Sequence, residues 1–389
     1  EHLDVRWART EMTLQQWEPH NDNDDPDAPD WDRFRDADAD TSKLRWEFEL
    51  ARRLQDRGIP YAISVWHLPN WCYADPTRSQ HDYRRHIAPG MWPEVAESIV
   101  TYLQHAKRAH GVEPDLFSFN EPDIGVRVLM TPEQHHRAVL DLGRRFAAAG
   151  LKTQLLLGDV SNARDTHTYL DTFVTHRPAT EAAGALGVHT WGGTSPAQFA
   201  AWRDTADRFK LPLLVTEFGS DPHAWRTGAY TDWFYAIQEL KLLGQLMHHA
   251  RPQSILTWEY TADYALLTET PPRSGNLVPT PRFHFTWHFS NLLPTDARYL
   301  KITSDHPAVQ VVGLVAATDP ADGWVVHIAN LGAARPFTLI GVPTELTSLA
   351  CTQTTRTEPR VSRDPVAPNH GQVTLILPAQ SLTTLHHLP

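Results

Sequence analysis

The sequence lacks the features that mark membrane, nucleic-acid-binding and disulfide-rich proteins. Its 389 residues include two cysteines, Cys72 and Cys351, so one disulfide is allowed and none is required. No run of about 18 apolar residues occurs, so we expect no membrane span. The net charge is −11 without a dense Lys/Arg cluster, which argues against a nucleic-acid partner.

Motifs that hold nucleotides, activate a serine or bind zinc are also missing. The chain has no Gly-rich phosphate loop, no Gly-x-Ser-x-Gly elbow and no His-Glu-x-x-His helix. Three histidine pairs are adjacent in sequence and therefore lack the i, i+4 spacing of a helical zinc site: His135-His136, His248-His249 and His386-His387. We expect neither a cofactor nor a metal ion.

An acidic segment from Asn21 to Asp40 imitates part of a calcium-binding loop. Asp36, Asp38 and Asp40 alternate as the ligands of such a loop do, but Thr41 stands where the loop needs Gly. A solvated acidic loop that leads into a helix is the preferred interpretation, because the helix dipole favours negative charge at its N-terminus.

The composition is typical of a soluble protein with more than one domain. The chain of 44.0 kDa is 41% hydrophobic and 21% charged, which allows a large core and a smaller module. Its 14 Trp would suit a carbohydrate cleft, because indole faces stack on sugar rings, although most Trp in proteins is packing. The chain opens at Glu1 without a signal peptide, as a trimmed form would; the compartment stays open, with an extracellular or periplasmic one favoured.

Strand and helix patterns alternate through the first two thirds of the chain, which predicts a parallel sheet built from βαβ units. We expect a (β/α)8 (TIM) barrel over residues 1–280, although only seven strands can be found, and we place a first strand upstream of Glu1. The expected strands are Val5–Arg9, Tyr61–Trp66, the run ending at Asn120-Glu121, Gln154–Val160, Ala185–Trp191, Leu213–Glu217 and Ser254–Tyr260. The expected helices cover residues 42–57, 92–110, a segment opening at Thr131-Pro132, 164–176, 196–209 and 228–249.

Beyond residue 280 the pattern changes to short β-rich runs. Their spacing is typical of a small antiparallel sandwich, so we expect a β-sandwich domain over residues 281–389. The expected strands are Val309–Ala316, Trp324–Asn330, Phe337–Gly341, Thr347–Thr352, Val373–Leu377 and Ser381–His386.

Two glutamates stand at the ends of predicted barrel strands. Glu121 follows the run Leu116–Phe119, and Glu217 ends the run that begins at Leu213. Because a (β/α)8 barrel carries its chemistry at the carboxyl ends of its strands, both side chains would face one cleft. Paired carboxylates at short range are what cleavage of a glycosidic bond needs. Each glutamate taken alone could equally be a strand-end residue bound to an arginine.

The chain resembles glycoside hydrolase family 30, the group of glucosylceramidases, β-1,6-glucanases and glucuronoxylanases. The likeness rests on four segments and extends over nearly the whole sequence: Trp66-His-Leu-Pro-Asn-Trp71-Cys72, Phe119-Asn-Glu-Pro122, Val215-Thr-Glu-Phe-Gly219 and His288-Phe-Ser-Asn-Leu-Leu-Pro294 with Arg298. The resemblance implies a retaining β-glycosidase, with its acid/base on strand four and its nucleophile on strand seven. The family usually has His-x-Tyr after the sixth strand, whereas this chain has His189-Thr190-Trp191.

The chemistry assigns roles to the two glutamates and their neighbours. Glu121 would be the general acid/base and Glu217 the ionised nucleophile, which needs a cationic neighbour. We expect Arg6 to be that neighbour, with a structural salt bridge as the alternative, and Asn120 to hydrogen-bond the sugar 2-hydroxyl. Aromatic and imidazole side chains at strand ends would line the substrate pocket: Trp66, Trp71, His189, Trp191 and Trp258.

Other functions remain open at this point. A non-catalytic carbohydrate-binding protein would keep the same scaffold, a surface-interaction protein would use the β-domain as an adaptor, and an inverting glycosidase or a transglycosylase would share these residues. The expected partner in the preferred interpretation is a β-linked glycoside or polysaccharide.

Overall fold

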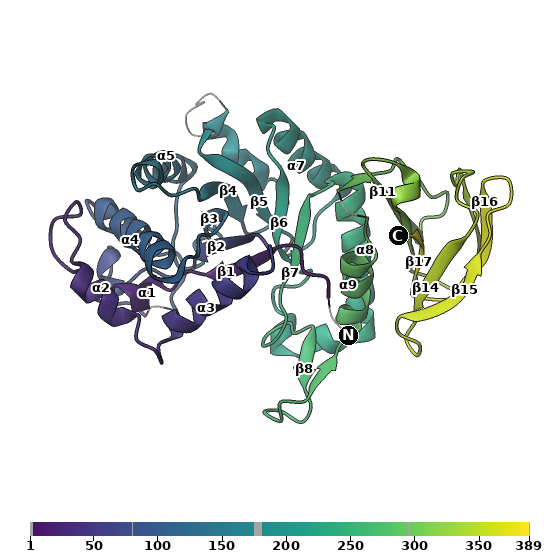
Figure 1. Cartoon of the computed structure of the whole chain (residues 1–389), viewed down its shortest axis with the longest axis horizontal. Coiled ribbons are helices and arrows are strands. Elements are labelled where there is room, and N and C mark those ends of the chain that lie inside the picture. Colours follow the sequence, from purple (N-terminus) through teal and green to yellow (C-terminus); the bar gives the residue numbers. More distant parts are fainter. Residues whose placement is uncertain (1–2, 80, 175–180, 295, 389) are drawn as a thin grey trace.

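The computed structural model describes residues 3–79, 81–174, 181–294 and 296–388. The chain forms a ring of parallel strands wrapped by helices, followed by a strand-rich domain that lies at one end of the elongated molecule (Figure 1). The N-terminus lies near α9 and β8, and the C-terminus lies among the strands of the second domain.

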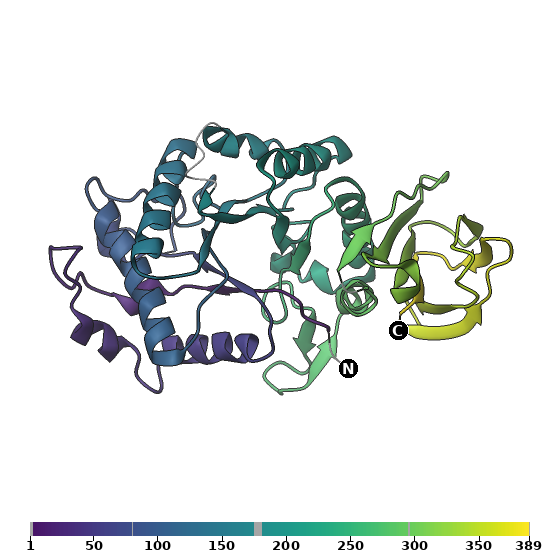
Figure 2. The ribbon, with the colours of Figure 1, turned by 45° about the horizontal axis from the view of Figure 1, so that its top comes forward.

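The barrel sheet contains seven parallel strands paired in chain order. They are β1 (Ala8–Glu11), β2 (Tyr61–Val65), β3 (Leu116–Phe119), β4 (Gln154–Val160), β5 (Ala183–His189), β6 (Leu213–Phe218) and β7 (Ser254–Thr257). The sheet curves into a nearly closed ring, and its two edges are β1 and β7 (Figure 2). Among the described residues no strand bridges these edges, so the barrel has the seven strands that the sequence pattern contains.

Helices cover the outside of this ring. The α-helices are α1 (Leu14–Trp17), α2 (Trp31–Ala37), α3 (Lys43–Gln55), α4 (Trp92–His110), α5 (Pro132–Ala148), α7 (Pro196–Phe209), α8 (Trp233–His249) and α9 (Pro281–Asn291). Short 3-10 segments are Asn70–Cys72, Thr166–Phe173, Ala224–Arg226, Ala229–Thr231 and Pro320–Asp322, and Leu267–Glu269 (β8) pairs with Leu277–Pro279 (β9).

Local sequence explains where two of these helices begin. Thr131 and Ser195 each accept a hydrogen bond from the backbone three residues later, and the Gln at that position bonds back to the cap. Each reciprocal cap satisfies two backbone N–H groups that the first turn leaves unpaired. Pro follows at the first helical position in both, where its missing N–H costs nothing.

The barrel encloses one apolar layer and is surrounded by another. The inner layer packs Trp7 against one small or branched apolar residue from each of five strands: Ala62, Leu116, Leu156, Ala185 and Leu214. The larger core lies between the strands and the helices around them. Both layers consist of apolar side chains, so the buried polar groups at the strand ends are exceptions and indicate a functional site.

The second domain is an antiparallel β-sandwich. One sheet has the order β10 (Ala297–Tyr299), β11 (Val309–Ala316), β12 (Trp324–Asn330), β17 (Ser381–His387), β14 (Leu349–Thr354) and β15 (Val361–Val366). The other pairs β13 (Arg335–Ile340) with β16 (Gln372–Leu377). Apolar residues of both sheets share one core, and α8 and α9 pack against β12 and β17 through a separate apolar cluster.

The expected fold class is therefore confirmed, with corrections to single elements. The first strand lies at Ala8–Glu11 and not at Val5–Arg9, because Trp7 packs into the barrel interior before the chain pairs with β2. Residues 31–37 of the acidic segment form α2, capped by Asp30, where we expected a loop. Strands β10 and β15 escaped prediction because they are short or carry polar residues, as edge strands do. The domain boundary after residue 280 stays a prediction.

Two further expectations concern covalent and membrane features. Cys72 and Cys351 are both free and buried. None of the helices in the described ranges combines the length and apolar character needed to cross a bilayer.

Candidate active site

Glu121 and Glu217 meet at the carboxyl ends of the barrel strands. Glu121 follows β3 and Glu217 lies on β6, and an oxygen of each lies with a ring nitrogen of His189 in a group whose atoms are within 4.8 Å of one another. Both glutamates are buried, at 8% and 5% exposure. Two carboxyl groups therefore share a site that is largely shielded from water.

The backbone at Glu121 takes a conformation that side-chain-bearing residues rarely adopt. Its φ is +44°, in the left-handed region. Its N–H donates to the Asp159 carbonyl oxygen at 2.9 Å, and its own carbonyl oxygen accepts from Gly125 N–H at 3.0 Å. This departure from strand geometry turns the side chain toward His189, whose Nδ1 lies 2.9 Å from Glu121 Oε1.

Asp159, on β4, links the groups around the two glutamates. It is completely buried and accepts hydrogen bonds from Arg9 Nη2 at 2.7 Å and Ser118 Oγ at 2.6 Å. It also lies 3.1 Å from His189 Nε2. His189 is thus held between Asp159 on one side and Glu121 on the other, while its Nδ1 lies 3.3 Å from Glu217 Oε2.

Arg9, on β1, supplies a second buried cation. Its Nη1 donates to Glu217 Oε1 at 2.8 Å, and its Nη2 donates to Asn120 Oδ1 at 2.7 Å. The guanidinium also lies over the Trp66 ring, 4.3 Å from its centroid. Arg9 therefore fixes Glu217 and Asn120 relative to Asp159 from the opposite wall of the barrel.

The indole of Trp191 completes the surroundings of Glu217. Its Nε1 donates to Glu217 Oε2 at 2.9 Å, so the two oxygens of this carboxylate have separate donors. The indole lies against the backbone of Gly219, and a Cβ at Gly219 would overlap its six-membered ring. Thr190 Oγ1 accepts from Gly219 N–H at 3.0 Å and donates to Gly219 carbonyl oxygen at 2.7 Å, which fastens the two strand ends together.

Solved structures with this architecture include proteins described as glycoside hydrolases. A GH30 endoxylanase from Clostridium papyrosolvens C71 superposes with a TM-score of 0.73 at 17% identity, over 99% of this chain and 97% of that one. A family 30 subfamily 8 xylanase, Xyn30A, from Clostridium acetobutylicum gives 0.73 at 14% identity over the same shares. GH30 xylanase C from Talaromyces cellulolyticus gives 0.68 at 16% identity, over 98% of this chain and 86% of that one. These similarities establish a family 30-like fold.

A family model matched by the sequence indicates the same class of enzyme. Residues 62–253 match the family model described as Glycosyl hydrolase catalytic core. The protein is a glycoside hydrolase. Both Glu121 and Glu217 lie inside the matched range, and the implied partner is a carbohydrate. Among curated proteins, none matches this chain by sequence.

The electrostatics of the hydrolase site separate its ionisable groups. Burial is the largest influence on Glu121 and raises its pKa, His189 lowers it, and the negative charge of Glu217 raises it again, to about 7 overall. Burial alone would lower the pKa of His189, but the charge of Glu217 and hydrogen bonds to Asp159 and Glu121 raise it to about 10. Burial opposes ionisation of Asp159 as well, yet Arg9 and His189 hold its pKa far below the usual range.

The structure brings most of the predicted site residues to the surroundings of Glu121 and Glu217, but not all of them. Trp66 and Trp258 lie side by side, with ring centroids 6.0 Å apart. Trp71, in contrast, donates from Nε1 to the carbonyl oxygen of Glu18 at 3.1 Å and belongs to the outer loop.

Arg6 is not the cation beside Glu217. Its guanidinium binds Asp4 Oδ2 at 3.0 Å and the carbonyl oxygen of Pro294 at 3.3 Å, so the structural salt bridge that we weighed as the alternative is found. The reason is the later start of β1, which carries Arg9 and not Arg6 to the catalytic end of the barrel.

Sequence reasoning missed Arg9 and Asp159. Asp159 had a usable signal, because a carboxylate inside the apolar run Leu155–Val160 must find a cationic partner once buried. The first predicted strand, Val5–Arg9, contains both Arg6 and Arg9. Without the register of that strand, the sequence does not show which of the two arginines reaches Glu217.

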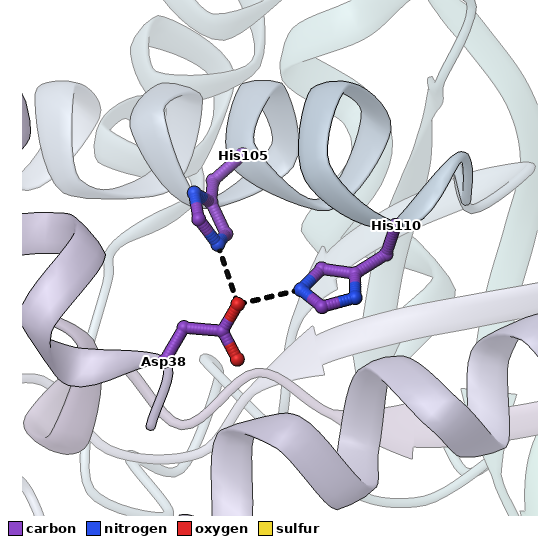
Figure 3. Close-up of side chains that lie close together, drawn as sticks. All are labelled: Asp38, His105 and His110. Carbon is purple, nitrogen blue, oxygen red and sulfur yellow. Dashed lines mark hydrogen bonds and ion pairs between the residues drawn. The ribbon is translucent and has the colours of Figure 1, made fainter. Parts of the chain in front are cut away.

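A second histidine-containing cluster lies outside the hydrolase centre. Asp38 Oδ2 lies 2.8 Å from His105 Nε2 and 2.6 Å from His110 Nε2 (Figure 3). Arg45 Nε donates to the other oxygen, Oδ1, at 2.8 Å. Each oxygen of Asp38 already has a nitrogen partner, so this part of the acidic segment ties the start of α3 to the end of α4.

Proposed function

We propose that the protein hydrolyses β-linked glycosides with retention of configuration, by double displacement. In the first step Glu217 would attack the anomeric carbon while Glu121 gives its proton to the glycosidic oxygen. In the second step Glu121 would take a proton from water, which then releases the sugar from Glu217.

The short separation of the two carboxyl groups carries this proposal. Retaining enzymes hold their carboxyl groups about 5–5.5 Å apart, whereas inverting enzymes need about 6.5–9.5 Å to admit a water molecule. Here an oxygen of Glu121 and one of Glu217 lie within 4.8 Å of each other. That spacing favours direct attack by Glu217 over attack by a water molecule held between it and the sugar.

The charge balance of the site supports the same division of roles. Arg9 and His189 supply two positive charges, which balance the carboxylates of Asp159 and Glu217 when Glu121 carries a proton. Donors from Arg9 and Trp191 reach Glu217, which suits a nucleophile that must stay ionised. The pKa of about 7 lets Glu121 donate a proton in one step and accept one in the next.

Neighbouring groups would position the sugar. Asn120 accepts from Arg9 through Oδ1, so its NH2 group is left to donate to the sugar 2-hydroxyl. Trp66 and Trp258 would form an aromatic wall for the sugar face. Because several proteins with this fold are described as xylanases, β-1,4-xylan and aryl β-xylosides are the first substrates to test.

The decisive experiment follows the first product by proton NMR and challenges two variants with azide. The β-anomer must appear first, Glu217→Ala must lose turnover and regain it with azide as an α-glycosyl azide, and Glu121→Ala must give the β-glycosyl azide. Glu133→Gln, an exposed carboxylate on α5, is the matched control and should behave as the wild type.

Each alternative predicts a different result. The α-anomer as first product would indicate inversion. Binding of xylan without turnover would indicate a carbohydrate-binding protein, and transfer of the sugar to an added alcohol in preference to water would indicate a transglycosylase. Absence of both binding and turnover across gluco-, xylo-, fuco- and galactosides would favour an adaptor role.

A further inference from the structure

A second group of carboxylates is buried between the segment that follows α1 and the first turns of α4. One oxygen each from Asp22, Glu94 and Glu97 lies within 4.8 Å of the others. Their exposed fractions are 8%, 8% and 3%, and the neighbouring Glu18 is 2% exposed. Four acidic side chains thus share one region of the interior.

These carboxylates have no cationic partner among the ion pairs of the described residues. Other buried acids in this chain are paired: Asp159 with Arg9, Asp38 with Arg45 and Glu239 with Arg282. An isolated buried carboxylate is costly, so it is normally paired or bound to a metal ion.

The hydrogen-bond partners of the group are too few to replace such a cation. Glu18 accepts from Ser98 Oγ and from the N–H of Asp22. Asp22 accepts from the N–H groups of Asn23 and Asp30 and from Asn23 Nδ2. No donor in the described part of the chain reaches either oxygen of Glu97, or Oε2 of Glu94. Three buried carboxylate oxygens of the group are therefore left without a donor.

The chemistry of this group matches a hard divalent cation. All of its ligand atoms are carboxylate oxygens, without an imidazole or thiolate in the set, which is the preference of Ca²⁺. Ca²⁺ binds oxygens at about 2.3–2.6 Å, so oxygens on opposite sides of the ion lie up to about 5 Å apart, as these do. Asn21, next to Asp22, adds another buried side-chain oxygen that no donor reaches.

We propose that Asp22, Glu94 and Glu97 bind a Ca²⁺ ion, with Glu18 beside it. The ion would neutralise the group and fasten the segment after α1 to α4. The backbone of Glu18 is also tied to the segment after β2, because Trp71 Nε1 donates to the carbonyl oxygen of Glu18 at 3.1 Å. Ca²⁺ would therefore stabilise the packing of α4 against this outer segment without entering the chemistry of the active site.

Thermal unfolding tests the site directly. The full chain is treated with EGTA, dialysed, and melted with and without millimolar CaCl2. Wild type should gain several degrees in Tm with CaCl2, because a ligand that binds only the folded state stabilises it. Glu97→Gln should lose most of that gain, whereas Glu49→Gln, whose side chain is 43% exposed on α3, should keep it.

Tb³⁺ luminescence provides a second, independent measurement. Tb³⁺ replaces Ca²⁺ at oxygen sites, and Trp71 lies beside Glu18 as an energy donor. Excitation of Trp should give saturable Tb³⁺ emission at one site per chain, which CaCl2 displaces and which Glu97→Gln abolishes. If Glu97→Gln does not fold, Asp22→Asn serves in its place.

The alternative is a proton shared between Glu94 and Glu97. In that case CaCl2 would leave the Tm of wild type unchanged and no saturable Tb³⁺ emission would arise, and the proposal would be wrong. Neither measurement depends on glycoside turnover, so the outcome is independent of the proposed hydrolytic mechanism.

Discussion

At the scale of single residues, the active centre works through environment more than through residue type. Glu121 and Glu217 are the same amino acid, yet one contacts His189 while the other receives donors from Arg9 and Trp191. The two carboxyls differ in which charges and donors face each one. This difference suits the proposed roles of Glu121 as acid/base and Glu217 as nucleophile.

If Glu121 is the acid/base, as proposed, its raised pKa should set the alkaline limb of activity. Because the acid must be protonated in the free enzyme, kcat/KM should fall as pH rises through about 7. The pH profile of xylan or aryl xyloside hydrolysis measures this limb. With a substrate whose leaving group is activated, kcat/KM of Glu121→Ala for formation of the glycosyl-enzyme should not fall over this pH range. If it still falls, a group other than Glu121 is responsible for the titration.

Gly219 controls the hydrogen bond between Trp191 and Glu217. Gly219→Ala should push the indole away from Glu217 and lower kcat/KM roughly ten-fold, the effect of losing one hydrogen bond to a charged group. Trp191→Phe should give a similar loss, and the double variant should be no worse than either single one. Additive losses measured by steady-state kinetics would show that the two residues act separately.

At the scale of elements, the register between neighbouring strands determines which side chains lie together in the site. The pairing of β5 with β6 shifts between Val188 and His189, so that His189 stands opposite Glu217. A regular register would put Thr216 there, whose hydroxyl instead donates to Asp159 Oδ1. The irregularity therefore decides which side chains share the end of the barrel.

Asp38 joins α2 and α3 to α4, and its removal should destabilise the fold. Asp38→Asn should lower the free energy of unfolding by about 3 kcal/mol at pH 7, because it breaks a buried ion pair. Asp40→Asn is the matched control, since Asp40 contacts the same Arg45 but its side chain is 93% exposed, and it should change stability by less than about 0.5 kcal/mol.

The effect of Asp38→Asn should also depend on pH. Burial opposes ionisation of Asp38, but His105, His110 and Arg45 hold its pKa below the usual value. The stabilisation from a carboxyl with a lowered folded pKa is present above its unfolded pKa of about 4 and is lost as pH falls through the folded value. Urea unfolding at several pH values should show the two proteins converging in acid; a constant gap would contradict the assignment.

At the scale of the whole molecule, the β-sandwich is docked on the barrel by buried polar contacts as well as apolar ones. His288, on α9, lies 2.8 Å from Thr384 on β17 and 2.8 Å from Thr354 on β14. Phe285, on the same helix, packs with Leu382 of β17 in the apolar cluster between α8, α9 and the sandwich. The second domain therefore covers apolar surface that the barrel helices would otherwise expose.

Removing the imidazole of His288 should loosen this docking without touching the catalytic centre. His288→Ala should lower the free energy of unfolding by about 2–4 kcal/mol, because it creates a cavity and removes two buried hydrogen bonds. Activity at 25 °C should stay within about two-fold of wild type. Differential scanning calorimetry and steady-state kinetics measure both, and a loss of kcat/KM at unchanged stability would contradict the structural role.

The sequence alone determined the elements whose signals are local. The segment 92–110 became α4 and the segment 196–209 became α7 with the expected bounds, since apolar periodicity and caps depend on residues a few positions apart. The end-of-strand positions of Glu121 and Glu217 followed from the same kind of signal.

Only the tertiary structure decided which charges meet. Arg9, Asp159 and His189 come from strands that are distant in sequence, and their contacts depend on the register and curvature of the sheet. The sequence could not choose between Arg6 and Arg9, because a shift of a few residues in the start of β1 exchanges their places. Local patterns specify helices and strands, whereas the pairing of buried charges is fixed by packing over long distances along the chain.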